Sequence, residues 1–181
     1  MKADLFSTAL ETASGTYLID PTPLTPEAVA SWVGQDKVAG IVVTNENHER
    51  AAAQFSEKFA VPIYLSAKLI GATRLPSAAP VQDNGFLAAL TAVEIAGAPA
   101  GEIAIHSVSD EGTMVIGDAL INFEPYGFAL LPAKYCSNFK VMRRSLSRLL
   151  DYSFDRMLFA HGLPILSCAR ERLEQLLKDH R

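Results

Sequence analysis

The feature that most constrains the fold is a pair of continuous apolar segments, joined by a polar loop and a short helical pattern. Residues 38–43 (VAGIVV) are apolar without alternation, which is typical of a strand buried on both faces. Residues 44–48 (TNENH) form the polar loop, and residues 49–59 repeat apolar side chains at helical spacing. Residues 60–65 (AVPIYL) predict a second buried strand. Such a unit places its two strands parallel, with chemistry in the loop after the first of them.

Further strand and helix patterns surround this unit. Residues 5–10 and 16–20 predict a hairpin that turns at Ser14 and Gly15. Other strands are expected at 86–96, 103–108, 113–116 and 155–160, and helices at 26–34, 138–150 and 167–180. Residues 66–84 and 121–137 lack a clear period and are expected to be loops. The pattern predicts a layered α/β sandwich, and the length of 181 residues predicts one domain spanning 1–181.

Composition excludes several classes of function. The chain has 16 Lys and Arg against 20 Asp and Glu, so its net charge of −4 argues against a nucleic-acid binder. No apolar run approaches the roughly 20 residues that span a bilayer, and no secretory leader is recognisable, so we expect no membrane association. Cys136 and Cys168 form no metal-binding spacing and indicate reduced thiols of a cytoplasmic protein. A hydrophobic content of 49% is compatible with a homodimer.

Several short motifs follow the predicted strands. They are, in order, TYLIDPTPL at 16–24, TNENHER at 44–50, GAPAG at 97–101, GDAL at 117–120 and AHG at 160–162. In its order, with each motif following a predicted strand, this series resembles the metallo-β-lactamase superfamily. The resemblance implies a four-layer αββα sandwich. It also implies a site at one sheet edge where histidines and aspartates hold zinc or iron for hydrolysis.

The residues at the matched ligand positions depart from that family. The histidines and the aspartate of the first motif correspond here to Asn45, Asn47, Glu49 and Arg50, and the histidine of the third motif corresponds to Ala98. Only Asp118 and His161 keep metal-binding chemistry at their matched positions. Because a catalytic zinc takes three protein ligands, we expect no cofactor, with zinc or iron on Asp118 and His161 as the alternative.

Arg50 is the most informative of these departures. If its guanidinium points to the metal position, it replaces the metal electrostatically and pairs with Asp118 or Glu49. The alternative is that Arg50 points into solvent from the start of the helix.

His48 lies one position beyond a matched ligand. We expect it to be a partly exposed loop or helix-cap residue; the alternative is that it joins Glu49, Asp118 and His161 around one metal. Asp20 is expected to brace the site loops. His161 is expected to be a structural histidine bonded to Asp118 or to a backbone carbonyl, with ligand binding or general-base chemistry as the alternative. The remaining candidates are expected to be structural or solvated: His106, His180, Arg143, Arg144 and Arg148.

The sequence therefore predicts a pseudoenzyme whose remnant cleft binds a small molecule or a protein partner. Two alternatives stay open: a hydrolase with an atypical single-metal site, and an interaction or oligomerisation module without a functional cleft. No P-loop, dinucleotide-binding glycine motif or nucleophile elbow is present, and no catalytic residue can be named from the sequence.

Overall fold

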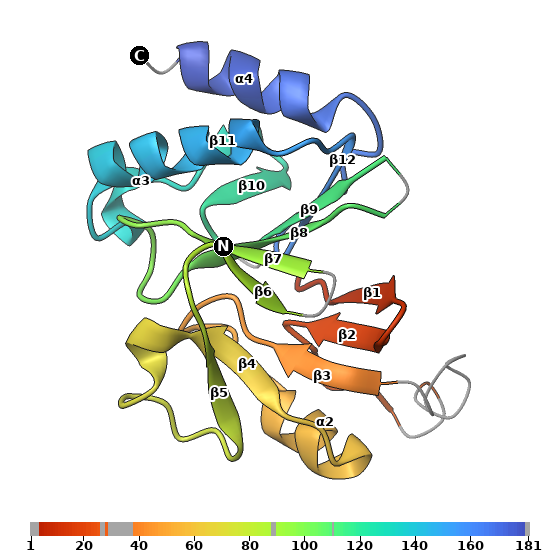
Figure 1. Cartoon of the computed structure of the whole chain (residues 1–181). Helices are drawn as coiled ribbons and strands as arrows, with labels where there is room; N and C mark the ends of the chain where they lie inside the picture. Colours follow the sequence, from red (N-terminus) through yellow and green to blue (C-terminus); the bar gives the residue numbers. More distant parts are fainter. Residues whose placement is uncertain (1–3, 26–27, 29–37, 88–89, 110, 180–181) are drawn as a thin grey trace.

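A computed structural model describes residues 4–25, 28, 38–87, 90–109 and 111–179. Within these ranges the strands form two large sheets and a separate two-stranded ribbon (Figure 1). The first sheet has the order β1 (Thr8–Thr12), β2 (Gly15–Ile19), β3 (Val38–Val42), β4 (Ile63–Ser66), β5 (Ala78–Val81). The second has the order β12 (Arg156–Phe159), β9 (Thr113–Ile116), β8 (Ile103–Ser107), β7 (Leu90–Glu94), β6 (Gly85–Leu87). The ribbon pairs β10 (Leu120–Phe123) with β11 (Gly127–Leu130).

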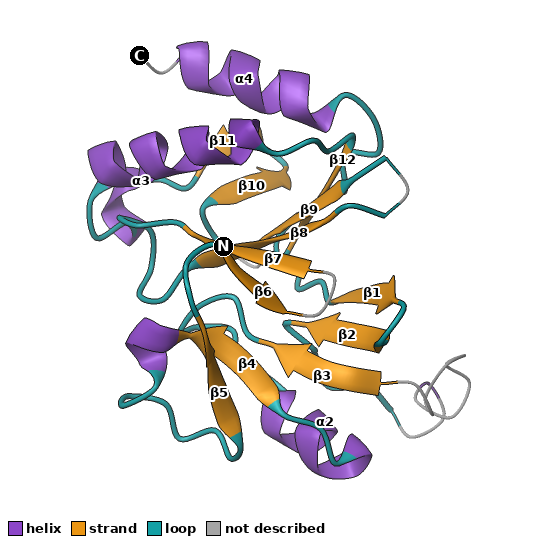
Figure 2. Cartoon of the chain, in the orientation of Figure 1, coloured by secondary structure: helices purple, strands orange, loops and turns teal. Residues whose placement is uncertain are grey.

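Helices cover the outer faces of the two sheets (Figure 2). Helix α2 (Ala52–Phe59) lies on the first sheet, and α3 (Phe139–Leu146) and α4 (Ala169–Asp179) lie on the second. Short 3₁₀ helices connect these elements: η2 (Ala67–Leu69), η3 (Ala133–Tyr135) and η4 (Ser147–Asp151). The predicted four-layer αββα sandwich is confirmed. No described helix has the length and apolar character needed to cross a membrane.

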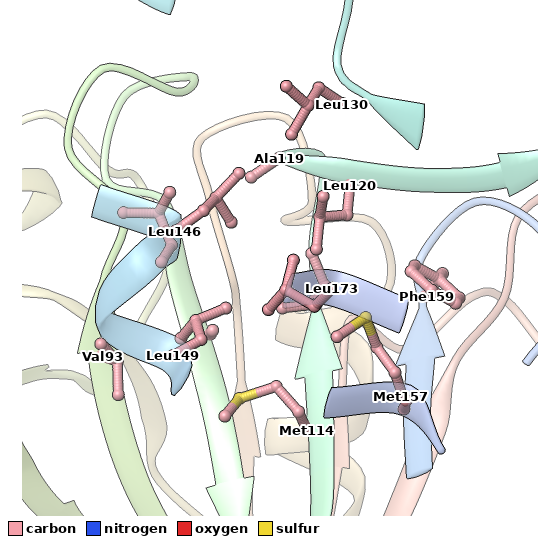
Figure 3. Packing of buried hydrophobic residues seen from close by; sticks show 14 of the residues in the cluster. Val93, Met114, Ala119, Leu120, Leu130, Leu146, Leu149, Met157, Phe159 and Leu173 are labelled. Carbon is pink, nitrogen blue, oxygen red and sulfur yellow. The ribbon is translucent and has the colours of Figure 1, made fainter. Parts of the chain in front are cut away.

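Three apolar clusters fill the spaces between the four layers. Tyr17 and Val42 of the first sheet meet Ile105 of the second in the central cluster. Because β3 and β4 send side chains to both faces, Ile41 packs instead on Phe55 of α2 in an outer cluster. The other outer cluster lies between the second sheet and its helices. Figure 3 shows its core: Leu146, Leu149 and Leu173 together with Val93 and Met114.

The parallel β-loop-α-β unit is confirmed, because β3 pairs parallel with β4 and α2 covers them. The hairpin of β1 and β2 and the Asn138 cap of α3 also agree with the sequence pattern. The predicted loops were wrong where they contain β5 and the β10–β11 ribbon. The helix predicted at 138–150 ends at Leu146 and tightens into η4. The helix predicted at 26–34 falls, apart from residue 28, outside the described residues.

Candidate functional site

Four loops meet at one edge of the sandwich, where parallel strands of both sheets end. Asp20 follows β2 and His48 lies in the loop after β3, and these strands run parallel. Asp118 follows β9 and His161 follows β12, which are the parallel pair of the second sheet. Because carboxyl ends of parallel strands lie together, side chains distant in sequence reach one place.

His48 lies at the centre of this cluster. It is 2% exposed, its Nδ1 is 2.8 Å from Asp20 Oδ2, and its Nε2 is 3.3 Å from Asp118 Oδ1. The expectation of a partly exposed loop residue was therefore wrong. A tight turn explains the difference: the His48 amide donates to the Asn45 carbonyl, and the Asn47 amide donates to Asn45 Oδ1. This turn directs His48 inward.

Asp118 joins His48 to the second histidine. Its Oδ1 is also 3.2 Å from His161 Nε2. One ligand atom from each of His48, Asp118 and His161 lies within 4.8 Å of the others. The Nδ1 atom of His161 is buried and has no hydrogen-bond partner in the described part of the chain.

Asp20 connects the cluster to the loop after β3. Its Oδ1 accepts the Thr44 amide at 2.8 Å, and its Oδ2 accepts the Thr44 hydroxyl at 2.6 Å. The same carboxylate contacts His48 Nδ1, so it fixes both the start of the loop and the orientation of the imidazole ring.

Glu102 belongs to the site although the sequence analysis did not select it. It is 1% exposed, and its Oε1 accepts the backbone amides of Asp118 at 2.8 Å and Ala119 at 3.0 Å. Its Oε2 accepts Asn45 Nδ2 at 2.6 Å, and the same amide nitrogen donates to Asp118 Oδ2 at 3.1 Å. The signal in the sequence was a carboxylate placed between the GAPAG motif and a fully buried strand.

Arg50 does not pair with a carboxylate of the site. Its Nη1 donates to the backbone carbonyls of Phe6 at 2.7 Å and Asp20 at 3.0 Å, while its buried Nη2 has no partner among the residues described. Neither prediction holds: Arg50 pairs with neither Asp118 nor Glu49, and it does not extend into solvent. The backbone at Arg50 has a φ of 36°, and this turn carries the side chain toward the N-terminal segment.

The remaining predicted positions lie outside the cluster. Asn47 is exposed, and Ala98 packs in the apolar cluster beneath α3. Glu49 accepts the Thr73 hydroxyl at 2.8 Å. The structure therefore brings together Asn45, Asp118 and His161 from the matched ligand positions, and it adds His48 and Asp20, which the sequence named as further candidates.

Burial and charge set the ionisation of these groups. Burial disfavours the charged imidazole, but the hydrogen bonds and charges of Asp118 and Asp20 raise the pKa of His48 to about 9. Burial also opposes ionisation of Asp118, yet contacts with His161 and His48 hold its pKa well below the usual range. Burial, together with the Asp118 carboxylate, raises the pKa of Glu102 to about 8.

The donor set fits one metal ion and does not fit a pair. Two imidazole nitrogens and one carboxylate oxygen converge from His48, His161 and Asp118, a ligand set that suits zinc or iron(II). Asp20 holds the far nitrogen of His48, as metal-bound histidines require. A second ion would need further ligands, but Asn47 is exposed, Ala98 has no donor atom, and Asn45 occupies the free oxygens of Glu102 and Asp118.

Solved structures share this fold. No family model matches the chain, and no curated protein matches it in sequence. A metallo-beta-lactamase family protein from Thermus thermophilus superposes with a TM-score of 0.68 at 20% identity, over 95% of this chain and 73% of the other. The chemotaxis sensor ODP, described as a peroxy diiron species, gives a TM-score of 0.76 at 13% identity, over 97% and 85%. TTHA1623 in a di-iron-bound form gives 0.64 at 21% identity, over 91% and 93%.

The chain therefore has the metallo-β-lactamase fold. The prediction that it has no cofactor is overturned by two findings: di-iron structures among its structural neighbours, and the convergence of His48, Asp118 and His161 in this chain. Asp118 and His161, the alternative pair of ligands, are joined by His48, which the second alternative placed with them around one metal. Glu49, the fourth residue of that alternative, lies outside the cluster.

Proposed function

We propose that this protein is a metal-dependent hydrolase that holds one divalent metal ion on His48, Asp118 and His161. The observation that carries the proposal is the approach of these three ligand atoms to within 4.8 Å of one another. A divalent ion in such a site polarises a carbonyl or phosphoryl oxygen and activates water. The substrate classes compatible with this chemistry are esters, amides, thioesters and phosphoesters.

The side chains around the ligands support this role. Asp20 Oδ2 contacts His48 Nδ1, and this contact leaves Nε2 directed at the Asp118 carboxylate. Asn45 binds Asp118 Oδ2, so Oδ1 is the oxygen that faces both imidazoles. These contacts orient the ligands before any ion arrives, which lowers the cost of binding.

A cleft of about 500 Å³ lies on the Glu102 side of the site, although none of the three proposed ligands lines it. Glu102 connects it to the site, because this residue binds the amides of Asp118 and Ala119. Lys68 and Lys134 also line it, and Lys68 pairs with Glu94. The cleft therefore presents both signs of charge to a polar substrate.

Metal titration tests this function. Protein stripped with a chelator is titrated with Zn²⁺, Mn²⁺ and, without oxygen, Fe²⁺, and bound metal is counted by elemental analysis. We expect one equivalent. His48→Ala and His161→Ala should weaken binding by more than the roughly 100-fold that loss of an outer-shell partner costs. His106→Gln is the matched control, because His106 is a buried histidine that instead contacts the Ser153 carbonyl.

The loaded protein is then assayed on ester, thioester and phosphoester substrates. Hydrolysis that requires the metal and is lost in His161→Ala supports the proposal. Failure to bind any of the three metals refutes it and favours a metal-free cleft that binds a ligand. Metal binding that survives both alanine substitutions places the ion elsewhere and also refutes it.

A further inference from the structure

A buried amide lies between two carboxylates at the base of the site. Asn45 is 0% exposed, and its Nδ2 donates to Glu102 Oε2 at 2.6 Å and to Asp118 Oδ2 at 3.1 Å. Two carboxyl groups brought this close together repel each other when both are ionised, unless a cation or a hydrogen-bond donor lies between them. We infer that the Asn45 amide takes the place of a second metal ion and limits the site to one.

The orientation of the amide is fixed by its other end. Asn45 Oδ1 accepts the Asn47 amide at 2.8 Å, so the NH₂ group is the end that faces the carboxylates. Both hydrogens of that group then have an acceptor. A flipped amide would lose three hydrogen bonds and place an oxygen against two carboxylates.

The carboxylates cannot turn away from the amide. The backbone amides of Asp118 and Ala119 hold Glu102 Oε1, which leaves Oε2 for Asn45. The imidazoles of His48 and His161 face Asp118 Oδ1, which leaves Oδ2 for Asn45. In each carboxylate one oxygen is therefore bound by Asn45 and the other by different partners, so a second cation could enter only by displacing Asn45.

The role of Asn45 rests on the proposed function only for the first ion, which is the ion held by His48, Asp118 and His161. The stoichiometry is a property of Asn45 and its two acceptors, and a substitution there can be tested whether or not His48 and His161 bind metal. Asn45→Asp replaces the amide with a third carboxylate in the same volume. Three converging carboxylates attract a divalent cation, so this variant should gain one equivalent of metal.

The experiment counts metal per chain in the wild type, Asn45→Asp and Asn47→Asp, by elemental analysis after equilibration with Zn²⁺ or Mn²⁺ and gel filtration. Asn47→Asp is the matched control, because it makes the same change of charge on the exposed face of the same loop. We expect one, two and one equivalents. An Asn45→Asp count equal to that of the wild type overturns the inference, and so does an equal gain in Asn47→Asp.

The two proposals fail separately. Zero equivalents in the wild type with one in Asn45→Asp would refute the metal-dependent hydrolase and support the role of Asn45. Two equivalents in the wild type would refute the role of Asn45 and leave the hydrolase standing. If Asn45→Asp does not fold, as judged by circular dichroism with and without metal, Asn45→His offers a neutral ligand in its place. If neither variant folds, a wild-type count of two equivalents at saturation overturns the inference, and a count of one that excess metal does not raise supports it.

Discussion

The stability of the metal-free protein should fall as the pH rises from 6 to 9.5, because the fold holds a proton on His48. Contacts with Asp20 and Asp118 raise the pKa of His48 from 6.5 to about 9. The folded protein binds this proton more tightly than the unfolded chain. The stabilisation is therefore complete below pH 6.5 and is lost as the pH passes through about 9.

The size of the effect follows from the pKa. At about 1.4 kcal/mol per pKa unit, the rise corresponds to about 3 kcal/mol of unfolding free energy. Because the His48 side chain is 3% exposed, solvent screening reduces this value little. Glu102, with its pKa raised to about 8, also makes the fold less stable as the pH rises. A reference variant is therefore needed to isolate the histidine.

The assay is urea unfolding in the presence of a chelator, at constant ionic strength and several pH values, for the wild type and His48→Gln. Both proteins keep Glu102, so its contribution largely cancels in the difference. The advantage of the wild type over the variant should shrink by about 3 kcal/mol between pH 6 and pH 9.5. A difference that stays constant or grows with pH would show that the imidazole is not held as a cation, and the reasoning would fail.

Three further substitutions test the scaffold by urea unfolding. In Gly117→Ala the new Cβ would lie 2.5 Å from Thr44 Oγ1, so we expect a loss of about 1–3 kcal/mol together with weaker metal binding; wild-type values for both would contradict the packing described. Arg50→Met removes the donor to two backbone carbonyls and should cost about 1–3 kcal/mol, whereas a solvated arginine would cost nothing measurable. Asn138→Ala removes the cap that accepts the Val141 amide and should cost about 1 kcal/mol, with metal binding unchanged.

The layers of the fold could be predicted because their patterns are local. The segments VAGIVV and AVPIYL are apolar throughout, which favours strands covered on both faces, and β3 and β4 lie within or overlap them. The β10–β11 ribbon, Leu120–Phe123 and Gly127–Leu130, was missed because Pro125, Gly127 and Pro132 gave its segment the composition of a loop. The two strands form a local antiparallel hairpin, joined by residues 124–126.

The site was predictable where a residue follows a strand directly. Asp118 and His161 follow β9 and β12 closely, so their place at the sheet edge follows from the topology. His48 lies deeper in a loop, and its direction depends on the turn that Asn45 closes. The direction of the Arg50 side chain depends on one left-handed backbone angle. Such turns are set by a few hydrogen bonds, and a residue-by-residue comparison of motifs does not reveal them.

The division of the chain between the two sheets has a consequence for folding. Residues 8–81 build the first sheet and supply Asp20 and His48, whereas the second sheet lies within residues 85–159 and its parallel strands lead to Asp118 and His161. The cluster exists only when the two halves of the chain have docked face to face. A metal ion bound at the site would therefore stabilise the docked state of the two halves. It would slow their separation more than it slows local unfolding within either sheet.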